Sequence, residues 1–206
     1  RRIFSRKTGH GLGRSGCISF IPSGVNPFSN LGDLMPVSGP NWKPDEKYYD
    51  CRYAVLREPL GFPRGAEILA DDDQAIHAWV EDGDKIVAVG RAHVIPESSD
   101  GSQADHAGPG AAHCPAFGPL TEGGPRPAIQ IRQMGTLETH TRQGNAAKVL
   151  SQLEDNAIKL FGATAGFLQA REHAIPFYQS QGWEIIDDEY EIKGIGPHRS
   201  MMKHFA

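Results

Sequence analysis

Apolar residues recur with helical spacing in two stretches of the chain. The clearer one is 145–161, where the residues on one stripe are Ala146, Val149, Leu150, Leu153, Ala157, Leu160 and Phe161. Gly162 follows directly and is typical of a helix end. The second predicted helix spans 45–60, and its stripe consists of Tyr49, Tyr53, Val55, Leu56 and Leu60. A further helix is predicted over 171–181, where Gly182 ends it.

Runs of β-branched and alternating apolar residues predict the strands. Residues 75–80 and 85–95 flank the pair Asp82-Gly83, a strong hairpin signal, so these runs should pair antiparallel. The three acids Asp71 to Asp73 ahead of them are predicted to form a solvated turn. The other strand candidates are 17–21, 129–136, 165–170, 183–190 and 200–205.

The predicted elements follow the order helix, hairpin, strand, helix, strand, helix and strand pair, which indicates a mixed α/β layer fold. The 206 residues are 39% hydrophobic and have a mean hydropathy of −0.42, as expected for one globular domain. Of 39 glycines and prolines, 12 lie in 1–44 and 11 in 98–127. We therefore predict an N-terminal arm over 1–44, and a domain over 45–206 that carries a Gly/Pro-rich insertion at 98–127.

The formal net charge of −4 argues against a general nucleic-acid-binding protein, because neutralising phosphates needs a dense field of lysine and arginine. The one basic cluster lies between Arg1 and Arg14 and is predicted to be a solvated arm. No apolar run approaches the length of about 18 residues that predicts a membrane span, so no membrane contact is expected.

The cysteines Cys17, Cys51 and Cys114 are odd in number and widely spaced. This pattern fits reduced thiols better than disulfides and predicts a cytoplasmic location. His106 and His113 lie near Cys114, but their spacing matches no zinc-binding pattern, so no metal is expected.

The segment that opens the helix at 145 is the strongest candidate for ligand chemistry. Thr141 to Ala146 have the sequence Thr-Arg-Gln-Gly-Asn-Ala and follow a predicted strand that ends near Thr136. The first N–H groups of a helix lack partners within it and lie at the positive end of its dipole, which suits a pyrophosphate. Gly144 and Ala146 are small enough for a ligand to approach the backbone. The alternative is a tight turn without a ligand.

This loop resembles the phosphate loop of the GNAT superfamily of acyl-CoA-dependent N-acyltransferases, whose pattern is Gln/Arg-x-x-Gly-x-Gly/Ala. Thr141 stands in place of the first Gln or Arg, and the neighbouring Arg142 could supply the charge. The strand at 129–136 looks like the splayed fourth strand of that family.

Two further patches are similar to the family in order and spacing. Leu168 to Trp183 resembles its Asn-Ala-Arg, Ala, Phe-Tyr and Gly-Phe pattern, with Gln169 in place of Asn and Trp in place of the last Phe. Tyr190 to Lys203 resembles the Glu-x-Gly-Ile-Pro-His-x-x-Met ending of one bacterial branch, with Gly196 as an extra residue.

The resemblance implies a fold and a cofactor. The fold is a mixed, mostly antiparallel α+β sheet with flanking helices and a cleft where the fourth strand splays from the fifth. The cofactor is acetyl-CoA, used as co-substrate without a metal. The residues implied to bind it are Met134, Gly135, Thr136, Arg142, Gln143, Gly144, Asn145, Ala146 and Gln169.

The resemblance also implies catalytic residues. Tyr178 occupies the position of a tyrosine that donates a proton to the coenzyme A thiolate; the alternative is a core tyrosine. His198 is the first candidate for the base that deprotonates the amine, with a structural histidine or a water chain as alternatives. His140 is expected to be a loop residue, and Arg57 and Glu58 are expected to line the cleft or its surface.

Three hypotheses for the function follow. The first is an N-acetyltransferase that acts on a small-molecule or protein amine. The second is a degenerate acyl-CoA-binding sensor or scaffold, and the third is a nucleic-acid-associated factor that uses the basic arm. The sequence specifies neither the acceptor amine nor whether the chain forms a homodimer, and it leaves open whether the 98–127 insertion is disordered, covers the cleft or packs on a partner.

Overall fold

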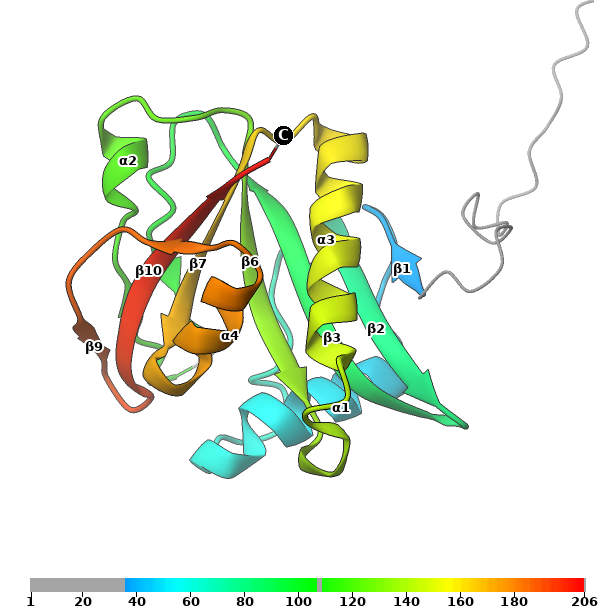
Figure 1. Ribbon diagram of the computed structural model, residues 1–206. Helices are drawn as coiled ribbons and strands as arrows, with labels where there is room; N and C mark the ends of the chain where they lie inside the picture. The colour runs from blue at the N-terminus through cyan, green and yellow to red at the C-terminus, as the bar shows by residue number, and fades with distance from the viewer. Residues whose placement is uncertain (1–35, 107–108, 206) are drawn as a thin grey trace, which may run out of the picture. The chain divides into compact units, whose positions relative to one another are not determined.

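The computed structural model describes residues 36–106 and 109–205 and has a mixed α/β architecture (Figure 1). Its main sheet has the strand order β1-β2-β3-β6-β7-β10-β8, and β9 pairs with β10. The strands of this sheet are β1 (Val37–Ser38), β2 (Ile76–Asp82), β3 (Lys85–Ile95), β6 (Ala128–Thr136), β7 (Ala165–Arg171), β8 (Glu184–Ile185), β9 (Tyr190–Ile192) and β10 (Gly196–His204). The predicted strand at 17–21 and the basic cluster lie outside the described residues.

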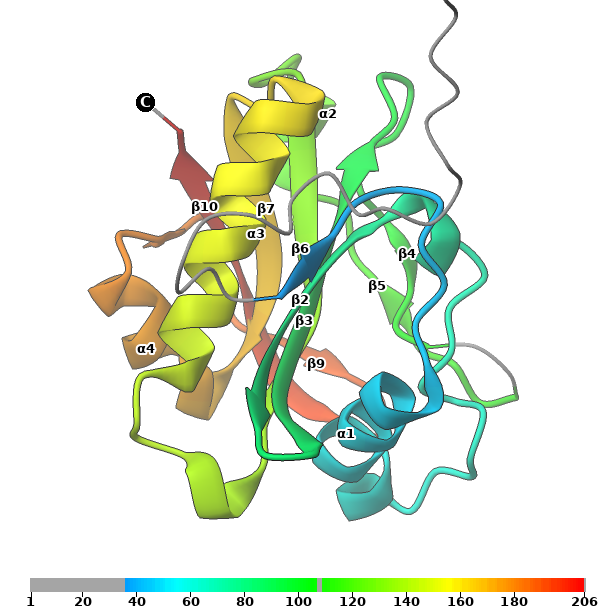
Figure 2. The same ribbon diagram turned by 90° about the vertical axis from the view of Figure 1, so that its right-hand side faces the viewer.

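Helices cover both faces of the sheet (Figure 2). α3 (Asn145–Phe161) and α4 (Ile175–Ser180) lie on one face. α1 (Glu46–Leu56) lies on the other, together with a small hairpin of β4 (Gln103–Ala104) and β5 (His113–Cys114). α2 (Gly118–Thr121) follows that hairpin, and short 3-10 turns occur at Glu58–Leu60, Asp72–Gln74, Glu138–His140 and Glu172–Ala174. The predicted helix at 171–181 is therefore a 3-10 turn followed by the short α4.

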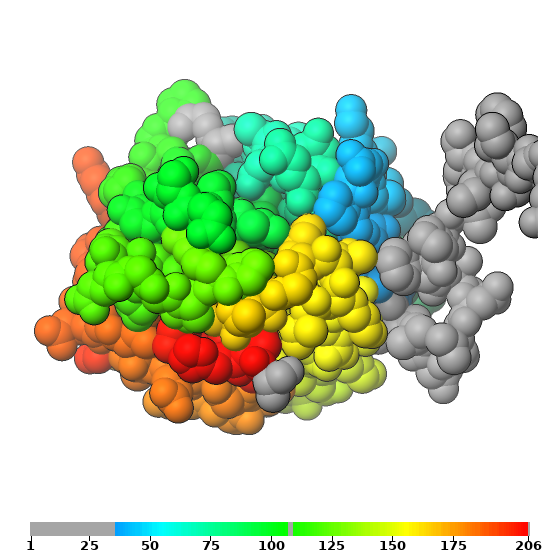
Figure 3. Space-filling view, turned by 90° about the horizontal axis from the view of Figure 1, so that it is seen from above, coloured from blue at the N-terminus to red at the C-terminus, as the bar shows by residue number. Residues whose placement is uncertain are grey.

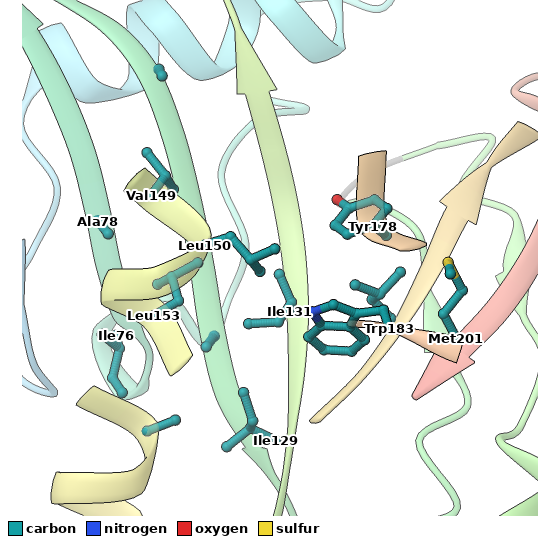
Figure 4. Close-up of a cluster of buried hydrophobic side chains, with 14 of the residues drawn as sticks. Ile76, Ala78, Ile129, Ile131, Val149, Leu150, Leu153, Tyr178, Trp183 and Met201 are labelled. Atoms are coloured by element: carbon teal, nitrogen blue, oxygen red, sulfur yellow. The ribbon is translucent and has the colours of Figure 1, made fainter. Parts of the chain in front are cut away.

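The predicted hairpin and the predicted helix α3 form the centre of the core. β2 and β3 pair antiparallel as expected. Val149, Leu150 and Leu153 of α3 belong to one apolar cluster with Ile76 and Ala78 of β2 and with Ile129 and Ile131 of β6 (Figure 4). This apolar contact fixes α3, and therefore its first turn, against the centre of the sheet.

The splayed strand that the family resemblance implies is present. β6 and β7 are parallel and pair only through Ala128–Gln130 and Ala165–Phe167, whereas the other strand pairs of this sheet are antiparallel. Beyond these residues the two strands diverge (Figure 1). On its other edge β6 stays paired with β3, through a bulge where Gln133 has φ 54°. The predicted mixed, mostly antiparallel fold is confirmed.

The prediction of a solvated turn at Asp71 to Asp73 is wrong. Asp72 is buried and forms an ion pair with the fully buried Arg52 of α1 at 2.9 Å. Asp71 binds Arg91 of β3 with two hydrogen bonds of 2.9 and 2.8 Å. Only Asp73 is exposed. Asp72 is buried, and Asp71 half-buried, because arginines distant in sequence neutralise them.

The buried face of α1 also differs from the predicted stripe. Its buried residues are Tyr48, Cys51 and Arg52 rather than Tyr49 and Tyr53. The Tyr48 hydroxyl donates to the Gly90 carbonyl oxygen of β3 at 2.9 Å. α1 therefore packs on β3 through polar contacts in addition to the apolar cluster of Tyr48 and Cys51 with Ile86 and Val89. An apolar pattern alone does not indicate the polar contacts.

The insertion at 98–127 packs against the sheet over its described part. Phe117 and Leu120 are buried in a second apolar cluster with Ala165 and Phe167 of β7. Figure 3 shows this segment, in green, beside the end of β10, in red, and the partly buried Met202 of β10 belongs to the same cluster. The described part of the insertion is therefore packed into the domain.

Two boundaries differ from the predictions. The predicted strand at 183–190 is instead two short strands, β8 and β9, and β10 begins at Gly196, ahead of the predicted 200–205. At the other end, Val37–Ser38 within the predicted arm pair with β2, and Trp42 stacks on Trp79 at 5.0 Å between ring centroids. The ordered packing thus begins several residues before position 45.

Candidate active site

The divergence of β6 and β7 produces a cavity of about 290 Å³. Its walls come from the end of α1, the outer halves of β6 and β7, the segment before α4, α4 itself and the start of β10. Asp105 and Cys114 of the insertion complete the lining. Stretches from the end of α1, the insertion, β6, the β7–α4 region and the start of β10 therefore meet at the point where β6 loses its parallel partner.

The outer half of β6 exposes one edge of its backbone to this cavity. Met134, Gly135 and Thr136 all line it, and Gly135 and Thr136 pair on their other edge with Val89 and Ala88 of β3. Backbone groups on the β7 side of this segment have no β-ladder partner in the described sheet. They are available to a ligand that lies between the strands.

Gly135 has a structural requirement of its own. A Cβ at this position would clash with the side chain of Val55 on α1. The glycine therefore allows the close approach of β6 to α1, independently of any ligand.

The loop from Thr141 to Ala146 forms the start of α3 as predicted. Arg142 and Gly144 have φ values of 58° and 80°, and no side chain caps the helix. The first bond of the helix runs from Lys148 N–H to the Gly144 carbonyl oxygen, which leaves the N–H groups of the first turn unused within it. Asn145 is buried, and its side-chain amide donates to the His140 carbonyl oxygen at 3.1 Å.

The remaining residues of this loop are accessible. Thr141, Arg142, Gln143 and Gly144 are exposed, and Ala146 is half-buried. The loop is not part of the cavity lining, although it follows β6 in the chain after only a short turn. His140, expected to be a loop residue, ends that turn and lies 3.0 Å from a carboxylate oxygen of Asp82.

Tyr178 of α4 lies between the diverging strands (Figure 4). Its ring packs on Phe177 and Trp183, with centroid distances of 5.0 and 6.3 Å. The side chain lines the cavity, and its hydroxyl forms no hydrogen bond with any residue of 36–106 or 109–205. Burial raises the pKa of Tyr178 above its usual value of 10.0, so the phenol stays protonated.

His198 lies across the cavity on β10. Its Nδ1 is 2.7 Å from the Gly196 carbonyl oxygen, and because a carbonyl can only accept, Nδ1 carries the hydrogen. The other ring nitrogen, Nε2, then has a free lone pair. Burial lowers the pKa of His198 below 6.5, with a further contribution from the charge of Arg171, so the ring is neutral at pH 7.

Gln169, which the resemblance implies as a cofactor-binding residue, also links the sheet to the insertion. It lines the cavity, but its amide nitrogen donates to the Pro115 carbonyl oxygen of the insertion at 2.9 Å, and its amide oxygen accepts from Gln130. The side chain therefore helps to hold the insertion on the sheet.

Three arginines of the lining are the main feature that sequence reasoning underestimated. Arg57 was expected near the cleft and is buried in its wall, whereas Glu58 is exposed. Arg132 and Arg171 were not singled out and line the same cavity. The available signal was that Arg132 and Arg171 alternate with apolar residues along their strands, which places both on the face opposite α3.

Other site classes have no support in the described part of the chain. No group of three or more His, Cys, Asp or Glu side chains there could hold a metal ion. None of its helices is long and apolar enough to span a membrane. Cys51 and Cys114 are both buried and free, and Cys17 lies outside the described residues.

Comparison with known proteins places this geometry in a family. A family model described as Acetyltransferase (GNAT) family matches residues 40–183. The uncharacterized N-acetyltransferase YitI of Bacillus subtilis (strain 168) is 32% identical over 76 residues, which are 37% of this chain and 50% of that protein. The chain therefore matches only half the length of this relative.

Solved structures show the same fold. A Lactobacillus plantarum protein classed as an N-acetyltransferase has a TM-score of 0.59 at 18% identity, covering 84% of this chain and 100% of its own. An aminoglycoside 6'-N-acetyltransferase complexed with coenzyme A has a TM-score of 0.54 at 13% identity, covering 82% and 97%. The Escherichia coli ribosomal-protein-S18-alanine N-acetyltransferase has a TM-score of 0.53 at 14% identity, covering 84% and 95%.

Identities this low establish the fold and nothing about the acceptor. The family model, however, covers more than half of the chain, and its match includes the splayed strand, the loop before α3 and Tyr178. This chain belongs to the acetyltransferase (GNAT) family.

Proposed function

We propose that this protein is an N-acetyltransferase that moves an acetyl group directly from acetyl-CoA to an amine. The observation that carries the proposal is the cavity at the divergence of β6 and β7, which places a phenol and a neutral imidazole in one lining. Tyr178 supplies the first from α4, and His198 supplies the second from β10. Direct transfer needs an acid and a base of this kind.

The acyl-CoA in this proposal lies along the open edge of β6. Backbone groups of Met134 to Thr136 bind its pantetheine and polarise the thioester carbonyl. The N–H groups between Arg142 and Ala146 bind its pyrophosphate, supported by the dipole of α3. Gln169 contributes as part of the cavity wall.

The reaction forms one bond and breaks one bond. The neutral amine attacks the thioester carbonyl carbon, His198 Nε2 takes a proton from the attacking nitrogen, and the carbon–sulfur bond breaks. Tyr178 donates its proton to the departing thiolate, and an acetylated amine and free coenzyme A result. The imidazolium of His198 then releases its proton to solvent, and the phenol of Tyr178 regains one. Here the likeness of residues 190–203 to one bacterial branch matters, because that patch supplies His198.

Two properties outside the reaction are also part of the proposal. The buried, free Cys51 and Cys114 support a cytoplasmic location. The acyltransferase domain corresponds to residues 45–206 together with the strand β1 that precedes them.

Two measurements separate this enzyme from a degenerate acyl-CoA-binding module. Coenzyme A should raise the melting temperature in both cases, because a ligand of the native state stabilises it. Only the enzyme releases free thiol from acetyl-CoA when pooled amines are added. If coenzyme A leaves the melting temperature unchanged, both hypotheses are wrong. If it raises the melting temperature but no thiol is released, the binding module is favoured.

We expect His198→Asn to lower kcat/KM by about ten-fold at pH 7, because the amine loses its base while water still provides a slower route. The asparagine amide can still donate to the Gly196 carbonyl, so the turn should persist. The acidic limb of the pH–rate profile should follow the lowered pKa of His198, with activity rising as the imidazole loses its proton below pH 6.5. Full activity together with an unchanged acidic limb in the variant would exclude His198 as the base.

We expect Cys114→Ala to retain kcat within about three-fold. Cys114 lines the cavity, but burial raises its pKa to about 11, so at pH 7 almost no thiolate is available to form an acyl-enzyme. Initial rates over a matrix of acetyl-CoA and amine concentrations should give intersecting double-reciprocal lines. Parallel lines, with an inactive Cys114→Ala, would instead indicate an acyl-cysteine route.

A further inference from the structure

Building on the proposed function, we propose that the acceptor amine carries a carboxylate, as an amino acid does, and that Arg57, Arg132 and Arg171 bind it. These three arginines line the cavity from α1, β6 and β7. Arg132 and Arg171 lie on the sheet face opposite α3, together with His198.

Arg57 and Arg132 are held in place by neutral oxygens. Both donate to the Asp105 carbonyl oxygen, at 3.3 and 2.9 Å, so two guanidinium groups meet at one backbone atom. Arg57 also donates to the Ala66 carbonyl and the Gln133 side chain, and Arg132 to the Gln103 side chain at 2.6 Å. Within the described residues, neither forms an ion pair.

Arg52 and Arg91, which lie outside the cavity lining, have a different kind of partner. Arg52 and Arg91 are fully buried, whereas Arg57 is nearly so and Arg132 and Arg171 are half-buried. Arg52 is paired with Asp72 at 2.9 Å, and Arg91 with Asp71 at 2.8 Å. A buried cation normally has such a partner, because its charge is costly to remove from water. Arg57 and Arg132 have fixed positions without a carboxylate partner among the described residues, which suits them to bind the carboxylate of a ligand.

Asp105, the one carboxylate of the lining, does not form an ion pair with these arginines. Asp105 accepts from His106 Nδ1 at 2.7 Å through one oxygen and from Ala112 N–H at 2.6 Å through the other. Both oxygens are therefore committed to the insertion. Burial lowers the pKa of Arg57 and of Arg132 to about 10 each, although the charge of Asp105 acts in the opposite direction on both groups.

Arg171 is the most available of the three. It ends β7 opposite His198 of β10, and its side chain has no hydrogen bond or salt bridge with any residue that the structure describes. Guanidinium groups bind carboxylates through paired, charge-assisted hydrogen bonds. A carboxylate held here would place the amine of the same molecule beside His198 Nε2. The same charges would repel a polyamine.

A carboxylate could also arrive on the acyl group, as in a dicarboxylic acyl-CoA. The geometry favours the acceptor, because the three arginines lie on the face of α1 and the insertion. Tyr178, which is to protonate the thiolate, belongs to α4 on the opposite face. In this proposal the cofactor therefore lies on the α4 side of the cavity, whereas the guanidinium groups lie on the side of α1 and the insertion.

The test compares each free amino acid with its C-terminal amide, which keeps the amine and side chain but lacks the carboxylate. Thiol release from acetyl-CoA should give kcat/KM values about 100-fold higher for the best amino acid than for its amide. Arg171→Gln should reduce this ratio to below about ten-fold, and Arg171→Lys should restore part of it. The coenzyme A thermal shift should be unchanged in both variants.

Arg199→Gln is the matched control, because Arg199 follows His198 on β10 but does not line the cavity. It should keep the wild-type ratio. Equal activity on acids and amides, a preference for diamines, or a preference for succinyl-CoA with uncharged amines would each overturn the inference. If no amine releases thiol, calorimetric titration of acids and amides into the coenzyme A complex decides it: selective binding of acids supports the arginine site even though the proposed transfer fails, and equal or absent binding overturns it.

Discussion

Asp72→Ala is expected to lower the free energy of unfolding by about 3–5 kcal/mol, the usual cost of leaving a buried charge without its partner. Asp72 binds Arg52 through three hydrogen bonds of 2.9 to 3.1 Å and lies 3.5 Å from Nε of Arg91. Both arginines are fully buried. Urea unfolding followed by tryptophan fluorescence measures the change, and Asp72→Asn, which keeps an acceptor oxygen, should lose less.

Asp73→Ala is the control for this prediction. It lies in the same 3-10 turn but is exposed, so its loss should stay within about 0.5 kcal/mol. Equal effects of the two substitutions would show that the turn itself, and not the ion pair, stabilises the fold. A small effect of Asp72→Ala alone would show that water reaches the two guanidinium groups and compensates them.

The same network makes stability depend on pH. Although burial alone would raise it, the charge and hydrogen bonds of Arg52 hold the pKa of Asp72 below its usual value, and Arg91 holds that of Asp71 at about 2. Both carboxylates therefore stabilise the fold fully above pH 4, and this contribution is lost as the pH falls toward 2. Burial lowers the pKa of His77 to about 4. Between pH 6.5 and 4 the unfolded chain therefore takes up a proton at this ring that the folded chain does not, so His77 begins to destabilise the fold at a higher pH than the two carboxylates do.

Local patterns predicted the elements that depend on local interactions. Both ends of α3 were predicted because its apolar stripe and its glycine at 162 agree, although Leu160 of that stripe is exposed. The β2–β3 hairpin was predicted because Asp82-Gly83 is a local turn signal between two runs of strand-forming residues. The predictions failed where distant residues decide the outcome: three adjacent acids at 71–73 indicate a solvated turn only if Arg52 and Arg91 are not brought to them.

The insertion shows a second limit of sequence patterns. Its glycines and prolines indicate a loop, yet Phe117 and Leu120 suffice to fix it in an apolar cluster with residues of β7. The two hydrophobic positions are too few to produce a periodic signal. Their consequence for the site is large, because the packed insertion brings Asp105 and Cys114 into the cavity wall.

The site was predictable to the extent that motifs describe backbone geometry. The splayed β6 and the loop before α3 are backbone features, and short sequence patterns indicate them directly. Arg57, Arg132 and Arg171 form a group only through tertiary packing, since they come from a helix and two strands. The features that a fold family shares were therefore visible in the sequence, whereas those that select an acceptor required the structure.

Tyr178→Phe is expected to lower kcat by about 10–100-fold with little change in the affinity for acetyl-CoA. The reason is the loss of the proton donor for the departing thiolate, a step in which general acids contribute on the order of 100-fold or more. Burial holds the pKa of Tyr178 above its usual 10.0, so the wild-type enzyme should show no alkaline loss of activity from this group up to about pH 10. Steady-state thiol release across pH measures both effects.

Structural damage is separable from the loss of the acid in this variant. The phenylalanine keeps the ring contacts with Phe177 and Trp183, and the missing hydroxyl has no hydrogen bond within the described chain, so the melting temperature should not fall. Tyr53→Phe removes a hydroxyl that bonds to the Phe62 carbonyl outside the cavity lining, and it should leave kcat unchanged. Unchanged turnover in Tyr178→Phe would assign the thiolate proton to water and reduce Tyr178 to a wall of the cavity.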